Sequence, residues 1–263
     1  MRMGFTLFLV SLLALGGAAH AADFDEIEKI LESGRFDQRV KALDQLAAAG
    51  QSKRTEALAL KAAEDEDWII QIKAIETLAV VGSDSSRKAL LKLSYEGEIQ
   101  GVRDAAIKTL SGLDRPRSVA RLAKLALKAK GMTKVYMLEA AGRLAGPDDL
   151  KKLRRFVKDK NVFGAAAGVR AIGRLAVHED IREDVLKSVR GVLELRDDTG
   201  DFLAYVAAVE ALAELGTPEA RDLLVNEILL QEDDDLYIQE RIARALTTMT
   251  DVEEALRGAL TLA

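Results

Sequence analysis

The chain has 263 residues, a formal net charge of −5, 49% hydrophobic and 5% aromatic residues, two histidines and no cysteine. The lack of cysteine excludes disulfides, thiolate zinc sites and Cys–His catalysis. The acidic balance disfavours a nucleic-acid partner, because such proteins usually present an excess of basic residues.

Residues 1–21 have the pattern of a secretory signal peptide. One arginine lies among the first three residues, residues 5–15 (FTLFLVSLLAL) are apolar, and Ala19 and Ala21 place small residues at the cleavage-determining positions. The apolar run is shorter than the roughly 20 residues of a membrane span, although a retained N-terminal anchor is the alternative. We therefore expect a mature chain, 22–263, that is a single domain, exported or secreted, with a bacterial periplasm as the favoured compartment and no integral membrane segment.

The mature chain repeats one helix signature seven times. Each copy is an alanine-rich run that ends at an apolar or small residue, here called the anchor: Leu46, Leu78, Leu110, Ala141, Ile172, Leu212 and Leu246. By subtraction, the anchors are 32, 32, 31, 31, 40 and 34 residues apart. A period of this size is typical of a solenoid, in which each repeat buries its apolar face against its neighbours.

Apolar residues spaced by three and four predict two helices in each repeat. The B helices, which carry the anchors, are expected at 37–49, 68–81, 100–113, 132–144, 162–175, 201–215 and 236–249. The A helices are expected before them at 25–34, 52–64, 84–96, 116–130, 148–158, 179–195 and 218–231, with a closing helix near 252–262. The predicted fold is an all-α, right-handed α-solenoid of about seven helix pairs with a C-terminal capping helix. Three glycines four residues after their anchors, Gly50, Gly82 and Gly216, are expected to end B helices.

Several stretches resemble the short HEAT-like repeats first named from phycobilin lyases, among them VRDAAIKTLSGLDRP, LEAAGRLAGPDDL and VAAVEALAELGTPEARDLL. In that family a valine–arginine pair often opens the B helix. Val102 and Arg103 match this pair and Arg39 keeps the arginine, whereas other repeats depart from it with Gln71, Lys134, Ala165, Tyr205 and Gln239. The resemblance implies an α-helical superhelix that most often binds other proteins, with a minority of members attaching or isomerising bilins.

We expect partner contacts on two surfaces. On the concave face of the B helices, the candidates are Arg39, Arg103, Lys134, Tyr136 and Tyr205. The second surface is a basic ridge on consecutive A helices within 115–160, where fourteen Lys or Arg face four Asp or Glu. Its candidate contacts are Arg121, Lys124, Lys128, Lys151, Arg154, Arg155 and Lys158. A solvated convex face is the ordinary interpretation of such a charge run.

The A-to-B turns combine carboxylates with aromatic residues. Carboxylates gather within 64–67, at Glu96 and Glu98, and within 197–201 and 232–235. We expect them to cap the following B helices, with an edge for a cation or a cationic partner as the alternative. Five aromatic residues stand nine or ten positions before their anchors and are expected to plug the ends of the repeat core: Phe36, Trp68, Phe163, Phe202 and Tyr237.

No motif of catalysis accompanies these repeats. After signal cleavage His178 is the one histidine left, Arg182 stands where a zinc-protease helix would have its second histidine, and no phosphate-binding loop is present. We therefore predict an exported, non-catalytic protein-binding scaffold or adaptor without a cofactor, which presents the concave B-helix surface and the acidic turns to another protein. One alternative is an enzyme-associated or bilin-lyase-like protein that binds a small ligand. The other is an electrostatic tether to anionic glycan or lipid head groups through 115–160.

Overall fold

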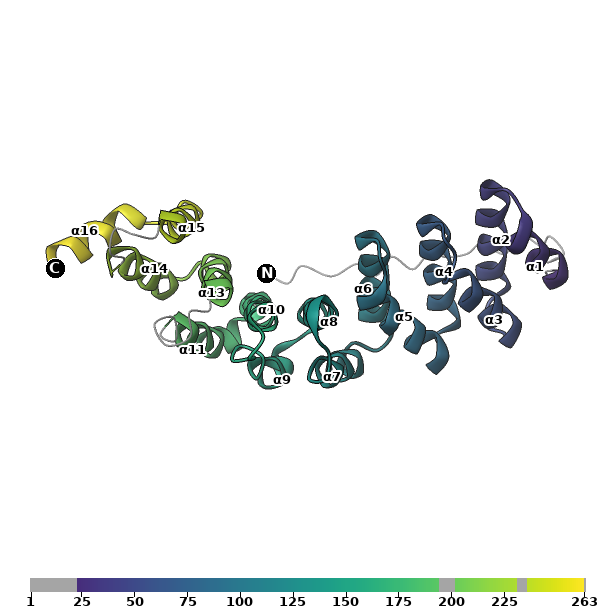
Figure 1. The fold of residues 1–263 in the computed structure, drawn as a ribbon, viewed down its shortest axis with the longest axis horizontal. Coiled ribbons are helices and arrows are strands. Elements are labelled where there is room, and N and C mark those ends of the chain that lie inside the picture. Colours follow the sequence, from purple (N-terminus) through teal and green to yellow (C-terminus); the bar gives the residue numbers. More distant parts are fainter. Residues whose placement is uncertain (1–22, 194–201, 231–235, 263) are drawn as a thin grey trace, which may run out of the picture.

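The computed structural model describes residues 23–193, 202–230 and 236–262, and within these ranges the chain forms helices and turns without a strand. Helix pairs follow one another along an elongated arch (Figure 1). The predicted all-α solenoid is therefore confirmed, whereas the handedness of its superhelix stays a prediction. The expected signal segment 1–21, and residues 194–201 within the 40-residue interval before Leu212, lie outside the described residues.

Within the described ranges, seven A–B pairs precede one closing helix. The first four pairs are α1 (Phe24–Ser33) with α2 (Phe36–Ala49), α3 (Lys53–Ala62) with α4 (Trp68–Val81), α5 (Asp84–Glu96) with α6 (Gln100–Leu113), and α7 (Arg115–Ala126) with α8 (Gly131–Leu144). The fifth comprises the 3-10 turn η1 (Pro147–Asp149), α9 (Leu150–Arg154), α10 (Val162–Gly173) and η2 (Arg174–Val177). The last two are η3 (Glu179–Ile181) and α11 (Arg182–Leu193) with α13 (Phe202–Leu215), and α14 (Pro218–Leu230) with α15 (Leu236–Leu246); α16 (Val252–Leu262) closes the array.

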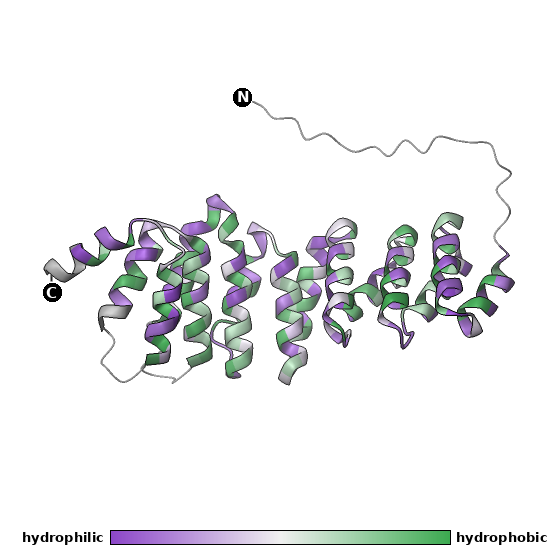
Figure 2. Cartoon of the chain, turned by 90° about the horizontal axis from the view of Figure 1, so that it is seen from above, coloured by the Kyte–Doolittle hydropathy of each residue, from purple (hydrophilic) through white to green (hydrophobic). Residues whose placement is uncertain are grey.

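The B helices lie on the inner side of the arch and the A helices on its outer side (Figure 1). In the same view α2, α4 and α6 are seen from the side, whereas α8, α10 and α13 are seen nearly along their axes, so the stack turns between α6 and α8. Seen from above, the helices carry both hydrophilic and hydrophobic residues (Figure 2). None of the helices in the described ranges is long and apolar enough to cross a membrane.

Local sequence sets where the helices begin and end. The Ser52 hydroxyl accepts a hydrogen bond from the Thr55 backbone N–H at the start of α3, and the Asp67 carboxylate accepts one from the Ile69 N–H at the start of α4. The glycines predicted to end B helices have positive φ angles of 75°, 61° and 60° at Gly50, Gly82 and Gly216. Because glycine has no Cβ, it adopts this backbone conformation without steric cost, and the three predicted helix ends are confirmed.

The anchors form the continuous core of the stack. All seven are buried, with 0–5% of their surface exposed. The stripe three residues after the anchors is less uniform, since Val81 and Leu144 are buried while Ala49 is exposed at the end of α2. Neighbouring B helices approach closely: a Cβ added to Gly142 would lie 2.6 Å from the Ala171 Cα atom. The contact between α8 and α10 therefore requires glycine at this position.

We predict that Gly142→Ala lowers the free energy of unfolding by about 1–3 kcal/mol, because the new methyl group would overlap backbone atoms of the neighbouring helix. Gly112→Ala in α6 is the matched control, since an added Cβ there has no atom within 4 Å. It should stabilise the chain by roughly 0.5–1 kcal/mol through helix propensity. Urea unfolding of both variants measures the difference, and equal stability of the two would contradict this account of the helix contact.

Candidate functional site

The position seven residues before each anchor, which Arg39 and Arg103 occupy in two of the repeats, faces the protein rather than the solvent. At about 100° per residue, seven residues bring a side chain to within about 20° of the anchor's direction. The Arg39 guanidinium lies 2.5 Å from the Asp65 carboxylate, and the Lys134 ammonium lies 2.8 Å from the Asp159 carboxylate. Both carboxylates belong to the A–B turn of the next repeat. These two ion pairs therefore clamp adjacent repeats together.

Two of the predicted partner contacts are wrong for this reason. Lys134 is only 8% exposed and Tyr205 only 1% exposed. The Tyr205 hydroxyl donates a hydrogen bond of 2.8 Å to the Glu227 carboxylate on α14, the A helix of the next repeat. Both side chains stabilise the stack, and neither presents a free surface to a partner. Arg39 is partly exposed but is engaged by Asp65.

Arg103 and Tyr136, predicted as separate contacts, lie against each other. The guanidinium carbon of Arg103 lies 4.4 Å from the centroid of the Tyr136 ring, a cation–π contact between α6 and α8. The same guanidinium donates hydrogen bonds to the backbone carbonyls of Gly97, at 2.6 Å, and Glu98, at 3.0 Å. Arg143 on α8 also pairs with Asp104 on α6. These residues join the two arms of the arch at the point where the stack turns.

The concave face carries a ladder of charged residues at the position two before each anchor. At this offset a side chain points about 200° from the anchor, away from the core. The ladder residues are Asp44, Glu76, Lys108, Glu139, Arg170, Glu210 and Arg244, and all are exposed or partly exposed. Sequence reasoning missed this ladder, although the constant offset from the anchors was the signal that could have found it.

Ion pairs link the ladder across neighbouring B helices. Glu210 on α13 pairs with Arg170 on α10, at 3.2 Å, and with Arg241 on α15, at 2.9 Å. Lys73 on α4 pairs with Asp44 on α2, at 3.2 Å, and with Glu76, at 3.0 Å. Hydrogen bonds to Glu76 and then to Asp44 raise the pKa of Lys73 above its usual value. The concave face is thus charged, of mixed sign and held in place by its own contacts.

The predicted basic ridge lies on the outer side of the arch. Its seven candidate residues, Arg121, Lys124, Lys128, Lys151, Arg154, Arg155 and Lys158, are all exposed. Arg154 pairs with Asp184 at 3.6 Å. For the other six, the described part of the chain supplies no ion-pair partner.

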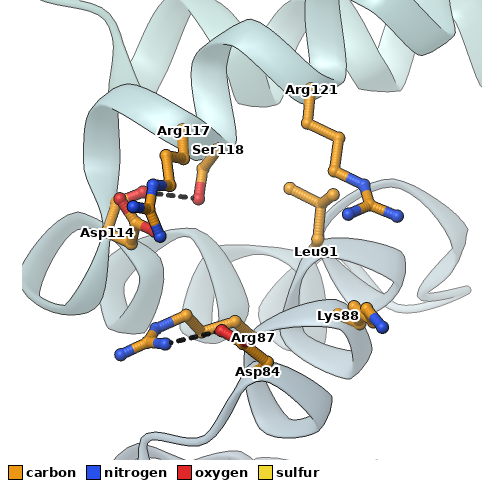
Figure 3. A pocket seen from close by; sticks show the side chains of 8 residues that line it. All are labelled: Asp84, Arg87, Lys88, Leu91, Asp114, Arg117, Ser118 and Arg121. Carbon is orange, nitrogen blue, oxygen red and sulfur yellow. Dashed lines mark hydrogen bonds and ion pairs between the residues drawn. The ribbon is translucent and has the colours of Figure 1, made fainter.

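A cleft of about 200 Å³ between α5 and α7 joins this ridge. Arg87 pairs with Asp84 in the cleft, at 2.9 Å, whereas Lys88 and Arg121 have no ion pair within the described residues. These two free cations lie on the same side of the cleft, around Leu91 (Figure 3). The outer face therefore offers positive charge to an anionic surface.

Most of the exposed apolar side chains form one row at the starts of the B helices. Within the described residues, nine of the twelve large exposed hydrophobic residues lie there: Phe36, Trp68, Ile99, Met132, Val162, Phe163, Phe202, Leu236 and Tyr237, each 38–75% exposed. This set is called the edge row below. The expectation that the five aromatic residues in it plug the repeat core is wrong. Positions nine and ten before an anchor point about 180° and 80° away from it, so the core cannot take them up.

The structure brings few groups of catalytic type together. Within the described residues, no cluster of three or more His, Cys, Asp or Glu side chains is arranged to hold a metal ion. His178 is partly exposed and stands at the N-cap position of η3 without a side-chain capping hydrogen bond. In the second A–B turn the Asp65 carboxylate accepts a hydrogen bond from the Asp67 N–H, while Asp67 caps α4, as expected of turn carboxylates. The acidic groups within 197–201 and 232–235 lie outside the described residues.

Comparison with known proteins agrees with this architecture. Residues 56–134 match the family described as HEAT repeats. This segment runs from within α3 to the start of α8, and helix pairs of the same construction continue on both sides of it. The family match is thus confined to residues 56–134, and the helix pairs outside it share its construction. No curated protein matches the sequence.

Three solved structures are similar to the chain at low identity. An engineered protein is 20% identical, with a TM-score of 0.42 over 90% of this chain and 71% of the other. The complex of CpcE and CpcF of phycocyanin lyase from Nostoc sp. PCC7120 is 18% identical, with a TM-score of 0.38 over 86% and 94%. Human deoxyhypusine hydroxylase in complex with glycerol is 17% identical, with a TM-score of 0.36 over 88% and 96%. At these identities and TM-scores, no activity of these proteins is inferred for this chain.

We predict that Asp159→Asn lowers the free energy of unfolding by about 1–3 kcal/mol, because the largely covered Lys134 ammonium loses its counter-charge. The asparagine keeps an oxygen that accepts the Asn161 N–H, so the substitution removes the charge rather than the turn. Glu240→Gln, in the exposed pair with Arg244, is the control and should change stability by less than about 0.5 kcal/mol. Similar urea midpoints for the two variants would contradict a stabilising role of the Lys134–Asp159 pair.

Proposed function

We propose that this chain is an exported, non-catalytic scaffold or adaptor that binds another protein along the rim of its concave face. The observation that carries the proposal is the edge row. Nine large apolar side chains are exposed in succession along the B-helix starts, from α2 to α15. Exposed large apolar side chains that recur at the same end of successive repeats are candidates for a binding surface.

The concave face next to the edge row supports this assignment. The three edge-row residues that stand nine before their anchors, Met132, Phe163 and Tyr237, are seven residues from the charged ladder and therefore share its side of the B helix. Because Glu210 already pairs with Arg170 and Arg241, the ladder is ordered before a partner arrives. Little conformational freedom would be lost on binding, which favours affinity. Export is supported by the sequence pattern of residues 1–21, and the absence of catalysis by the lack of cysteine and paired histidines.

A second candidate function is an electrostatic tether to an anionic surface. It is favoured by the exposed cations on and just after α7 and after α9, among them Lys124, Lys128 and Lys158, which have no ion-pair partner within the described residues. Such binding would weaken as salt screens the charges, whereas an apolar contact would persist.

The proposal predicts that Trp68→Gln with Phe163→Gln strongly reduces retention of a specific partner. The tagged mature protein would be purified from the exported fraction of its host at low and high salt, and bound proteins identified by mass spectrometry. Loss of two exposed aromatic contacts should reduce retention about tenfold or more, since aromatic side chains dominate interface energies. Val80→Gln with Val177→Gln is the matched control, because both valines are exposed but lie outside the edge row.

Retention of one partner at both salt concentrations, lost only in the edge-row variant, supports the scaffold. Lipid or polyanion released by salt, and lost on Lys124→Gln with Lys128→Gln, would favour the tether instead. Equal retention by the edge-row variant and the valine control would refute a binding role for the edge row.

A further inference from the structure

An open groove lies between two consecutive edge-row residues, at the junction of the second and third repeats. Its volume is about 740 Å³, and residues of α3 and α5 line it together with the start of α4 and the turns before α4 and α6. Trp68 and Ile99, both edge-row residues, contribute to the lining and are 47% and 48% exposed. Leu60 and Leu93 add partly buried apolar surface. The groove therefore combines an apolar lining with two large side chains accessible to a partner.

Several residues that line the groove are small. Ala63, Ala89 and Gly97 are among its lining residues. At Gly97 an added Cβ would lie 2.8 Å from the Leu93 carbonyl oxygen and 3.2 Å from the Arg103 Cγ atom, so the position cannot take a larger side chain without movement. The turn before α4 spans residues 63–67, whereas the turn before α6 spans only 97–99. The unequal turns leave space between the two repeats.

The groove is negatively charged as well as apolar. Its charged lining residues are one lysine, Lys92, and five carboxylates: Glu64, Asp65, Glu66, Glu96 and Glu98. Two of the carboxylates are neutralised, since Asp65 pairs with Arg39 at 2.5 Å and Glu96 pairs with Lys92 at 3.7 Å. The other three have no ion pair within the described residues, and all three are exposed. A partner with positive charge would complement them.

We propose that this groove binds a cationic, apolar peptide segment of a partner protein. One apolar side chain of the peptide enters between Trp68 and Ile99, and lysines or arginines on both sides of it pair with the three free carboxylates. A cation placed over the Trp68 ring would gain a further electrostatic contact. This inference rests on the proposed scaffold function and adds to it the chemistry of the segment recognised and the place where it binds.

Trp68 makes the test direct, because it is the single tryptophan of the chain. The hexapeptide Lys-Lys-Leu-Phe-Lys-Lys, titrated into the folded mature protein, should shift the tryptophan emission to shorter wavelength as solvent leaves the indole. The hexapeptides Glu-Glu-Leu-Phe-Glu-Glu and Lys-Lys-Ser-Ser-Lys-Lys should give no shift at the same concentrations. Because exposed charges contribute, the affinity for the first peptide should fall about threefold to tenfold between low and high salt.

Variants locate the binding site by fluorescence anisotropy of a labelled form of the same peptide. Glu66→Gln with Glu98→Gln, and separately Ile99→Asn, should each weaken binding by about tenfold, as expected when a charged pair or an apolar anchor is lost. Ile99 is the N-cap residue of α6, and asparagine is favoured at N-caps, so this variant is expected to fold. Glu183→Gln with Glu219→Gln removes the same charge from a different part of the surface and should leave binding unchanged.

The outcomes separate this inference from the scaffold proposal. Peptide binding that survives Ile99→Asn, or that the distant glutamate control weakens equally, would overturn the groove assignment. If no peptide binds while the edge-row variant still loses its partner, the groove assignment fails and the scaffold stands. If the partner is retained by the edge-row variant, the scaffold itself fails. Concentration-dependent dimerisation that Ile99→Asn abolishes, without peptide binding, would assign the groove to a second copy of the chain.

Discussion

The close approach of neighbouring B helices is the contact on which the rest of this molecule depends. No repeat encloses its own anchor, and the anchors are buried because helices of neighbouring repeats cover them. Small residues permit this, as the contacts of Gly142 with Ala171 and of Gly173 with Ala211 show. Once the B helices are fixed side by side, the A helices can only lie outside them, and the inner face is formed by whatever side chains point away from the anchors.

The direction of a side chain around its B helix then decides its role. Seven residues before an anchor, Arg39, Lys134 and Tyr205 are turned toward the neighbouring repeat and become clamps. Nine residues before an anchor, Phe163 and Tyr237 are turned outward and become exposed. One geometric rule, 3.6 residues per turn, thus separates residues that build the stack from residues that a partner can reach.

The sequence predicted the helices well because their signals are local. Periodic apolar residues and the glycines after the anchors placed nearly every B helix within one or two residues, although α15 ends three residues early and the fifth A helix is much shorter than expected. The site was harder to predict, since burial depends on neighbours that are distant in sequence. Tyr205 was predicted as a contact residue, but its hydroxyl donates a hydrogen bond to Glu227 on α14, which is distant in sequence. The groove beside Trp68 likewise depends on two turns of unequal length in different repeats. No single helix contains that information.

The turn of the stack between α6 and α8 has a mechanical consequence. The first three repeats form an arm joined to the remainder by a small set of contacts, in which Arg103 lies on Tyr136 and Arg143 pairs with Asp104. Displacement grows with distance from a pivot, so a slight rotation at this joint would move α1 much further than α6. The contact between α6 and α8 therefore sets the angle between the acidic groove on the first three repeats and the basic outer face of the later repeats.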